Sequence, residues 1–120
     1  MTSPRTILVI DDEPSVRMVA KAILSGAGYA VTEAADAGAA RAAVAETPRP
    51  FDLIFLDLGL AGENGASLIP DFRARTPGSR ILVVSGASAE DADGLAADAF
   101  LSKPFTRAVL LDTVRRVLAS

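Results

Sequence analysis

The chain has 120 residues, half of them hydrophobic (50%), which is the size and apolar content of one domain with its own core. Its formal net charge of −3 argues against nonspecific binding to nucleic acids or anionic membranes, and no apolar stretch approaches the roughly 20 residues that span a bilayer. The absence of cysteine and histidine excludes disulfides, zinc-hydrolase sites, Ser-His-Asp triads and a phosphohistidine of its own. The expected location is the cytoplasm.

Strand and helix patterns alternate along the chain. The apolar run 7–10 predicts a strand, and Pro14 suits the first position of the next helix, with Asp12 or Glu13 as its cap. Gly26 and Gly28 predict the end of that helix. The remaining predicted elements are strands over 29–33, 51–57, 81–84 and 99–102, helices over 37–46 and 67–75, a short fourth helix within 86–97, and a last helix capped by Thr106.

Two of the predicted helices contain residues that weaken them. Pro70 falls inside the helix over 67–75, where it removes a hydrogen bond, so this helix either starts late, near Ser67, or is kinked. The segment 86–97 has room for roughly two helical turns, and Gly94 disfavours a helix there by about 1 kcal/mol relative to alanine. We therefore expect a frayed fourth helix that is the least stable part of the fold.

The alternation of strands and helices predicts an α/β fold: a doubly wound, five-stranded parallel sheet with helices on both faces. Right-handed crossovers and the flavodoxin-like strand order 2-1-3-4-5 put the first and third strands side by side. Asp11, Asp12 and Asp57 would then be neighbours in space despite their distance in sequence.

Polar residues of complementary chemistry follow four of the predicted strands. They are Asp11 and Asp12, then Asp57, then Ser85, and finally Lys103. In an open parallel sheet the carboxyl ends of the strands line one crevice, where ligands bind. Three carboxylates, a hydroxyl and an ammonium group at one edge suit a divalent cation and a phosphoryl group on Asp57.

Five segments, in this order and at predicted strand ends, carry a resemblance to a known family: ILVIDDEP at 7–14, DLIFLDL at 52–58, Gly65, ILVVS at 81–85 and Lys103-Pro104-Phe105. Together they resemble a bacterial response-regulator receiver domain of the single-domain, CheY-like kind, and the match covers nearly the whole chain. The resemblance implies one receiver domain over 1–120 that acts in two-component signal transduction. It also implies a signalling protein that catalyses its own phosphorylation and slow dephosphorylation, and not an enzyme for an external metabolite.

The resemblance also implies a role for each site residue. Asp57 would accept a phosphoryl group from a histidine kinase or a histidine phosphotransfer protein. Mg²⁺ would bind to Asp12, Asp57 and the backbone carbonyl of Gly59, with Asp11 acting mainly through water. Lys103 would contact the phosphoryl oxygens.

A second set of implied roles concerns the switch and the partners. Ser85 would also contact the phosphoryl oxygens, Phe100 would change rotamer on activation, and Pro104 belongs to the loop beside the site. An output partner would bind the face formed by the segment 86–97, the strand over 99–102 and the last helix. The expected state is a monomer or a weak, phosphorylation-dependent dimer, acting as a switch or a phosphorelay shuttle.

Other protein classes share parts of this sequence pattern. A hydrolase of the haloacid-dehalogenase type normally has a second Asp two positions after its nucleophile, where this chain has Gly59. A P-loop nucleotidase or a flavodoxin-like electron carrier needs a phosphate-binding loop after the first strand, and the acidic run 11–14 is not one. A degenerate receiver that only binds partners, and a receiver cut from a hybrid histidine kinase, stay open. The Met1 start and the lack of a linker after Leu118 favour a stand-alone protein.

Overall fold

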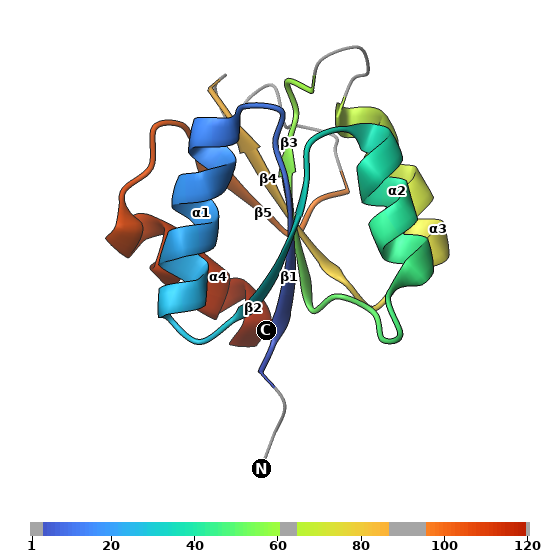
Figure 1. Cartoon of the computed structure of the whole chain (residues 1–120), viewed down its shortest axis with the longest axis horizontal. Coiled ribbons are helices and arrows are strands. Elements are labelled where there is room, and N and C mark those ends of the chain that lie inside the picture. The colour runs from blue at the N-terminus through green and yellow to red at the C-terminus, as the bar shows by residue number, and fades with distance from the viewer. Residues whose placement is uncertain (1–3, 61–64, 87–95, 120) are drawn as a thin grey trace.

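The computed structural model describes residues 4–60, 65–86 and 96–119, and the fold is the predicted one: a five-stranded parallel sheet in the order β2-β1-β3-β4-β5 (Figure 1). The elements in chain order are β1 (Thr6–Ile10), α1 (Pro14–Gly26), β2 (Ala30–Ala34), α2 (Ala37–Glu46), β3 (Leu53–Asp57), the 3₁₀ turn η1 (Gly65–Ser67), α3 (Leu68–Arg75), β4 (Arg80–Ser85), β5 (Ala99–Ser102) and α4 (Arg107–Ala119). The label α4 thus denotes the last helix. The short helix predicted within 86–97 falls on residues 87–95, which lie outside the described residues.

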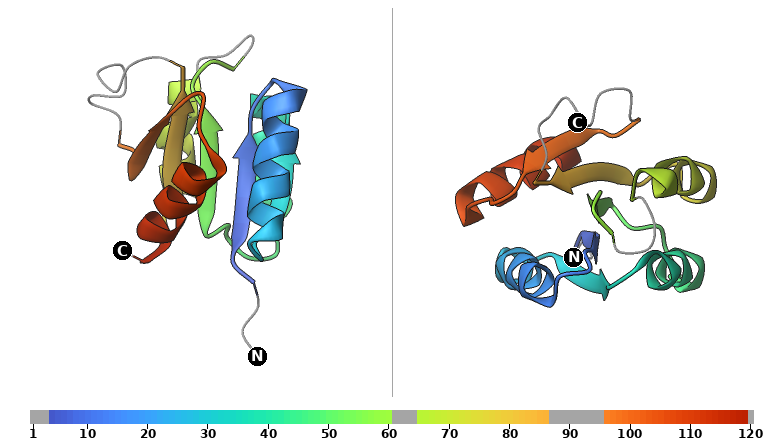
Figure 2. Two further views of the ribbon diagram at one scale, coloured as in Figure 1. Left: turned by 90° about the vertical axis from the view of Figure 1, so that its left-hand side faces the viewer. Right: turned by 90° about the horizontal axis from the view of Figure 1, so that it is seen from above.

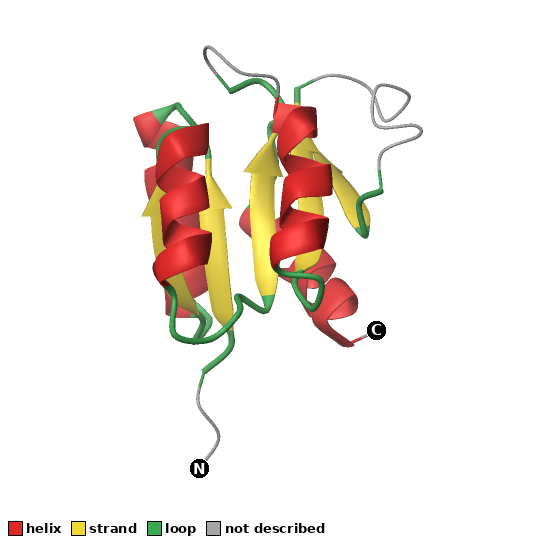
Figure 3. Ribbon diagram, turned by 90° about the vertical axis from the view of Figure 1, so that its right-hand side faces the viewer, coloured by secondary structure: helices red, strands yellow, loops and turns green. Residues whose placement is uncertain are grey.

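The helices form two layers around the sheet. α1 and α4 cover one face and α2 and α3 the other, as the view from above in Figure 2 shows. Figure 3 shows the α2 and α3 side in front of the strands. None of the described helices is both long enough and apolar enough to cross a membrane.

Each central strand is buried on both faces, which explains its continuous apolar sequence. All five residues of β3 are buried. Alternate strand residues pack into two cores. One core, against α2 and α3, contains Leu8, Ile10, Ile54, Leu56, Phe72, Ile81 and Val83; the other, against α1 and α4, contains Ile7, Val9, Leu24, Leu53, Phe55, Leu82, Val84 and Leu110.

The ends of α1 and α4 follow the predicted signals. α1 begins at Pro14, but the side chain of Glu13 at the cap position makes no capping hydrogen bond. Instead, Oδ1 of Asp11 accepts a hydrogen bond from the Glu13 N–H at 2.9 Å. Gly28 has a φ of +99°, which allows the chain to turn after the helix. Thr106 caps α4, because its Oγ1 accepts from the Val109 N–H at 3.1 Å.

The start of α3 shows how this helix accommodates Pro70. α3 begins at Leu68, so Pro70 lies in the first turn, where its missing N–H has no helical partner to lose. The preceding turn η1 begins at Gly65, whose N–H donates to the Leu58 carbonyl at 3.2 Å. A Cβ at Gly65 would lie 2.8 Å from the Cα of Leu58, so only glycine lets this turn pack against the end of β3.

Candidate functional site

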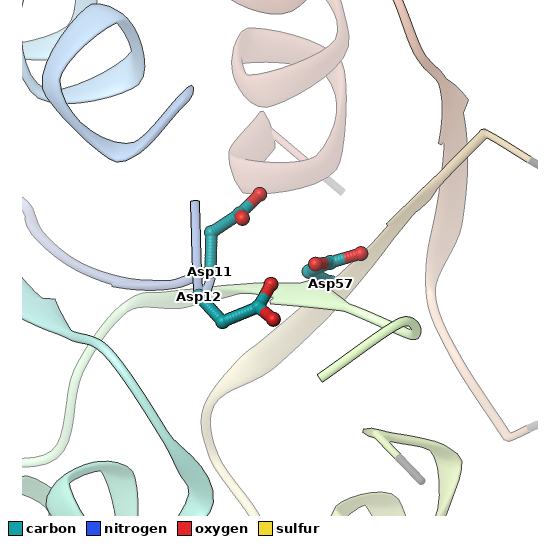
Figure 4. A group of neighbouring side chains, drawn as sticks. All are labelled: Asp11, Asp12 and Asp57. Carbon is teal, nitrogen blue, oxygen red and sulfur yellow. The ribbon is translucent and has the colours of Figure 1, made fainter. Parts of the chain in front are cut away.

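The carboxyl ends of β1 and β3 bring the three predicted carboxylates together. The register pairs Ile10 with Leu56, so Asp11, which follows β1, and Asp57, the last residue of β3, are neighbours. One carboxylate oxygen each from Asp11, Asp12 and Asp57 lies within 4.8 Å of the others. Figure 4 shows the three side chains grouped at this edge of the sheet. Asp11 is fully buried and Asp57 is 5% exposed, whereas Asp12 is partly exposed.

Lys103 joins this cluster from the loop after β5. Its Nζ lies 2.9 Å from Oδ2 of Asp11 and 3.4 Å from Oδ1 of Asp57. The Lys103 N–H donates to the Ser85 carbonyl at 2.8 Å, which ties the loop to the end of β4. The Lys103–Pro104 peptide bond is cis, and the Phe105 ring packs edge-on against Phe55 with the ring centroids 6.0 Å apart. These contacts hold the ammonium group over the carboxylates.

The burial and charges of the cluster shift two pKa values. Burial raises the pKa of Asp57 above its ordinary value of 3.8, and the charge of Asp11 raises it further, although the Gly59 N–H and Lys103 act in the opposite direction. Burial works to lower the pKa of Lys103, but the hydrogen bond to Asp11 and the charge of Asp57 outweigh it and raise that pKa. The lysine is therefore held as a cation, while Asp57 is harder to ionise than an exposed aspartate.

Gly59 contacts Asp57 through its backbone N–H, which donates to Oδ1 at 3.1 Å. A Cβ at Gly59 would lie 3.6 Å from that same oxygen, an ordinary contact distance, so sterics alone do not require a glycine here. The predicted role of the Gly59 carbonyl as a metal ligand stays a prediction.

Ser85 and Phe100, the two predicted switch residues, lie on adjacent strands next to the cluster. Asp57 pairs with Val84 in the register of β3 and β4, so Ser85 is one residue beyond the partner of Asp57, and it is 8% exposed. Phe100 pairs with Val83 and is half-buried against the core on the α2 and α3 side. Their placement fits the predicted roles and does not test them.

The sequence analysis missed Arg17. Its Nη1 donates to the backbone carbonyl oxygen of Asp11 at 2.7 Å, and its Nε lies 3.5 Å from Oε1 of Glu33 on β2. The only sequence signal was a cation one helical turn after Glu13 and one turn before Lys21. A solvent-exposed arginine has the same sequence pattern, so the sequence could not show that Arg17 contacts the backbone of the site.

The chemistry of the site follows from these groups. Three carboxylates that converge offer the oxygen ligands that Mg²⁺ and similar hard cations prefer. Next to them, a buried aspartate has an ammonium group 3.4 Å away, and an ammonium group can stabilise anionic oxygens.

Comparisons with known proteins identify the family and the fold. The family model described as the response regulator receiver domain matches residues 7–115. A solved receiver domain protein (CheY-like) from Methanospirillum hungatei JF-1 is similar with a TM-score of 0.88 and 30% identity, over 98% of this chain and 95% of that one. A response regulator protein from Burkholderia pseudomallei, solved with a phosphorylated aspartic acid, a calcium ion and citrate, has a TM-score of 0.82 and 29% identity, over 96% of this chain and 69% of that one.

Curated relatives show where such domains occur. The sensor kinase CckA of Brucella abortus is 34% identical over 123 residues, which is 98% of this chain and 13% of the kinase. Other relatives are named as transcriptional regulatory proteins. The chain spans about half or less of the length of the curated relatives that it matches.

Proposed function

The chain belongs to the response regulator receiver domain family, and we propose that Asp57 is its phosphoacceptor. The observation that carries this proposal is the position of Asp57, nearly buried between two other carboxylates and the Lys103 ammonium group. The phosphorylated aspartic acid and calcium ion in the structure of the Burkholderia pseudomallei relative support the same chemistry here.

In the proposed reaction, an Asp57 carboxylate oxygen attacks the phosphorus of a phosphohistidine on a histidine kinase or a histidine phosphotransfer protein. A P–O bond to Asp57 forms as the P–N bond of the donor breaks, and the imidazole nitrogen keeps the electron pair of that bond. Lys103 binds the phosphoryl oxygens as their charge is redistributed, from its place 3.4 Å from Asp57.

The cation in this proposal is Mg²⁺, and the residues that would hold it are Asp11, Asp12, Asp57 and, through its carbonyl, Gly59. The convergence of three carboxylate oxygens within 4.8 Å fits a cation that prefers oxygen ligands. When bound, the cation offsets negative charge on the phosphoryl oxygens and on the carboxylates themselves. Asp11 is fully buried and bonded to Lys103, so it would orient that lysine and act on the cation mainly through water.

An apolar cleft beside the site supports a protein as the phosphoryl donor. It is lined by Lys103 together with Val16, Val19, Pro104 and Phe105. Val19 is 51% exposed, and with its neighbours in this lining it forms a contiguous apolar surface of the kind that marks protein contacts. We propose that the donor protein packs an apolar surface here while its phosphohistidine reaches Asp57. Val19→Asp should then slow transfer from a cognate donor and leave labelling by a small phosphodonor unchanged.

The proposed consequence of phosphorylation is a conformational switch, or a shuttle step in a phosphorelay. Ser85 donates a hydrogen bond that exists only when the phosphoryl group is present, and Phe100 repacks in response. Ser85→Ala should leave labelling largely intact and weaken the response of Phe100, measured by ¹⁹F NMR with fluorinated phenylalanine. A block of labelling with normal switching would contradict these roles. The proposed output face consists of β5, α4 and the segment 86–97.

The decisive experiment uses acetyl phosphate or phosphoramidate with Mg²⁺ and intact-mass measurement. Wild type should gain the mass of one phosphoryl group, and Asp57→Asn should gain none. Asp52→Asn is the matched control, since Asp52 lies at the opposite end of β3, and it should be labelled like wild type. Equal labelling of Asp57→Asn would refute the proposed acceptor, and no labelling of wild type would favour a degenerate receiver that only binds partners.

A further inference from the structure

Arg17 lies behind the acidic cluster, at the backbone that carries it. We infer that Arg17 is a positioning residue that fixes the Asp11–Asp12 turn in the geometry that binds the cation; this inference rests on the proposed function. Its Nη1 donates to the Asp11 carbonyl oxygen at 2.7 Å, and its side chain is only 18% exposed. Arg17 touches no carboxylate of the cluster in these contacts, so any effect on the cation must pass through the backbone.

The hydrogen bond falls at a sensitive point of the turn. The carbonyl of Asp11 belongs to the peptide group that leads directly into Asp12, and a peptide group is planar. Holding that oxygen therefore fixes the peptide plane and the N–Cα bond from which Asp12 starts, and so restricts where its carboxylate can lie. The Asp11 N–H is held on its other side by the Ala34 carbonyl at 3.2 Å. The turn is thus fastened to β2 through Ala34 and to α1 through Arg17.

The guanidinium group is itself held by a second contact. Its Nε lies 3.5 Å from Oε1 of Glu33, and Glu33 follows Thr32 on β2, beside β1. A planar guanidinium group can make both contacts at once because its N–H groups point in fixed, different directions. Support of this kind around metal ligands typically changes metal affinity by about 10- to 100-fold when it is removed.

Charge and positioning predict opposite effects, which makes the inference testable. The positive charge of Arg17 near a cation site should weaken Mg²⁺ binding, so its removal would strengthen binding if charge dominated. If positioning dominates, removal weakens binding. Lys21 provides a matched control, because its Nζ lies 3.4 Å from Oε2 of the same Glu33. Both cations pair with Glu33, but Arg17 also donates a hydrogen bond to the Asp11 carbonyl oxygen.

The experiment measures Mg²⁺ affinity by isothermal titration calorimetry on the metal-stripped full chain. Arg17→Met keeps the apolar stem and removes the donors, and we expect its Kd for Mg²⁺ to rise about tenfold. Lys21→Met should stay within about twofold of wild type, as expected for an exposed, screened charge. An unchanged or lowered Kd in Arg17→Met, or an equal rise in Lys21→Met, would overturn the inference.

A second variant guards against misfolding of Arg17→Met, which would be seen as a lost melting transition without metal. Arg17→Lys keeps the charge, but its shorter, compact ammonium group cannot contact the Asp11 carbonyl and Glu33 together. We expect a Kd raised several-fold, and a wild-type Kd would overturn the inference. If wild type itself binds no Mg²⁺, the cation of the proposed function fails; if wild type binds and Arg17→Met binds equally well, only the role of Arg17 fails.

Discussion

The two ends of the sheet use aspartate in opposite ways. At the amino end, each acid that precedes a strand accepts a backbone N–H from the neighbouring strand. Oδ2 of Asp52 accepts from the Thr6 N–H at 2.7 Å, and Oδ2 of Asp98 accepts from the Ile81 N–H at 2.7 Å. Asp98 also pairs with Arg73 on α3, at 3.0 Å. These carboxylates satisfy backbone donors that the start of a strand would otherwise leave without a partner.

At the carboxyl end the acids face one another. Asp11, Asp12 and Asp57 converge within 4.8 Å, and Lys103 supplies the ammonium group that lies between Asp11 and Asp57. Burial and the neighbouring charge raise the pKa of Asp57, which means that the fold works against its ionised form.

The difference teaches how to separate structural from functional acids in this fold. Asp11 and Asp57 also each accept one backbone N–H, so this contact alone does not separate the two ends. What differs is that a carboxylate buried next to other carboxylates opposes its own ionised form, whereas one that meets backbone donors and a cation is stabilised as an anion. Groups whose environment disfavours their charged form are functional candidates for that reason. Substitutions at the two ends should therefore differ in their effects on the labelling rate and on the response to Mg²⁺. For the free energy of unfolding, the same substitution should have opposite effects at the two ends.

The largest expected effect is on the rate at which Asp57 is labelled. It distinguishes two basic side chains, Lys103 at the carboxyl end of the sheet and Arg73 at the amino end. Lys103→Ala should slow labelling of Asp57 by a small phosphodonor about 100-fold, as removal of one group that stabilises anionic oxygens typically does. Arg73→Ala removes the partner of Asp98 but should leave the labelling rate near wild type. Time-resolved intact-mass measurement with Mg²⁺ gives both rates. Comparable slowing in both variants would contradict a phosphorylation site confined to the carboxyl end of the sheet.

The next largest effect is on how much Mg²⁺ stabilises the folded chain. At about tenfold excess over its Kd, Mg²⁺ should raise the free energy of unfolding of wild type by about 1.4 kcal/mol, because it binds only the folded chain. Asp12→Ala should abolish that rise, while Asp98→Asn should keep it. Urea denaturation with and without Mg²⁺ measures the difference. A wild-type stability that does not respond to Mg²⁺ would count against the carboxyl-end site.

A smaller effect comes from the same substitution made at each end, without metal. Asp98→Asn keeps an oxygen for the Ile81 N–H but loses the charge that strengthens this bond and pairs with Arg73, so stability should fall by about 1 kcal/mol. Asp57→Asn removes a disfavoured charge and keeps an oxygen for the Gly59 N–H, so stability should rise. Chemical denaturation in a chelating buffer measures the stability of both variants. If both were less stable than wild type, the acids at the two ends would not differ in the way proposed.

Much of the fold was predictable from the sequence because local signals and topology agree. The helix over 37–46 and the strand over 99–102 have the predicted bounds, and the strand order is the predicted one. The strand predicted over 29–33 lies at Ala30–Ala34 instead, since its edge position gives only weak burial to define its ends. The strand predicted over 51–57 begins at Leu53, because Asp52 before it is used to bind the start of β1.

The residues of the candidate site were predictable from the sequence, but the contacts that hold them in place were not. Strand ends and topology suffice to bring Asp11, Asp12, Asp57 and Lys103 together, as the structure does. The contact of Arg17 with a backbone carbonyl depends on side-chain direction across α1, and backbone acceptors leave no trace in a sequence. The same holds for Asp52 and Asp98, whose role at the amino end depends on strand register.

The smallest expected effect is the pH dependence of the difference between Asp57→Asn and wild type, again without metal. The pKa of Asp57 is raised in the folded state, so the folded chain binds this proton more tightly than the unfolded chain. The resulting stability is fully present below the unfolded pKa, near 3.8, and is lost as the pH rises through the higher folded pKa. The advantage of Asp57→Asn should therefore be greatest near neutral pH and shrink as the pH falls through that window. Denaturation curves at a series of pH values test this, and an advantage that grows toward acid pH would mean that the carboxyl end stabilises the ionised form after all.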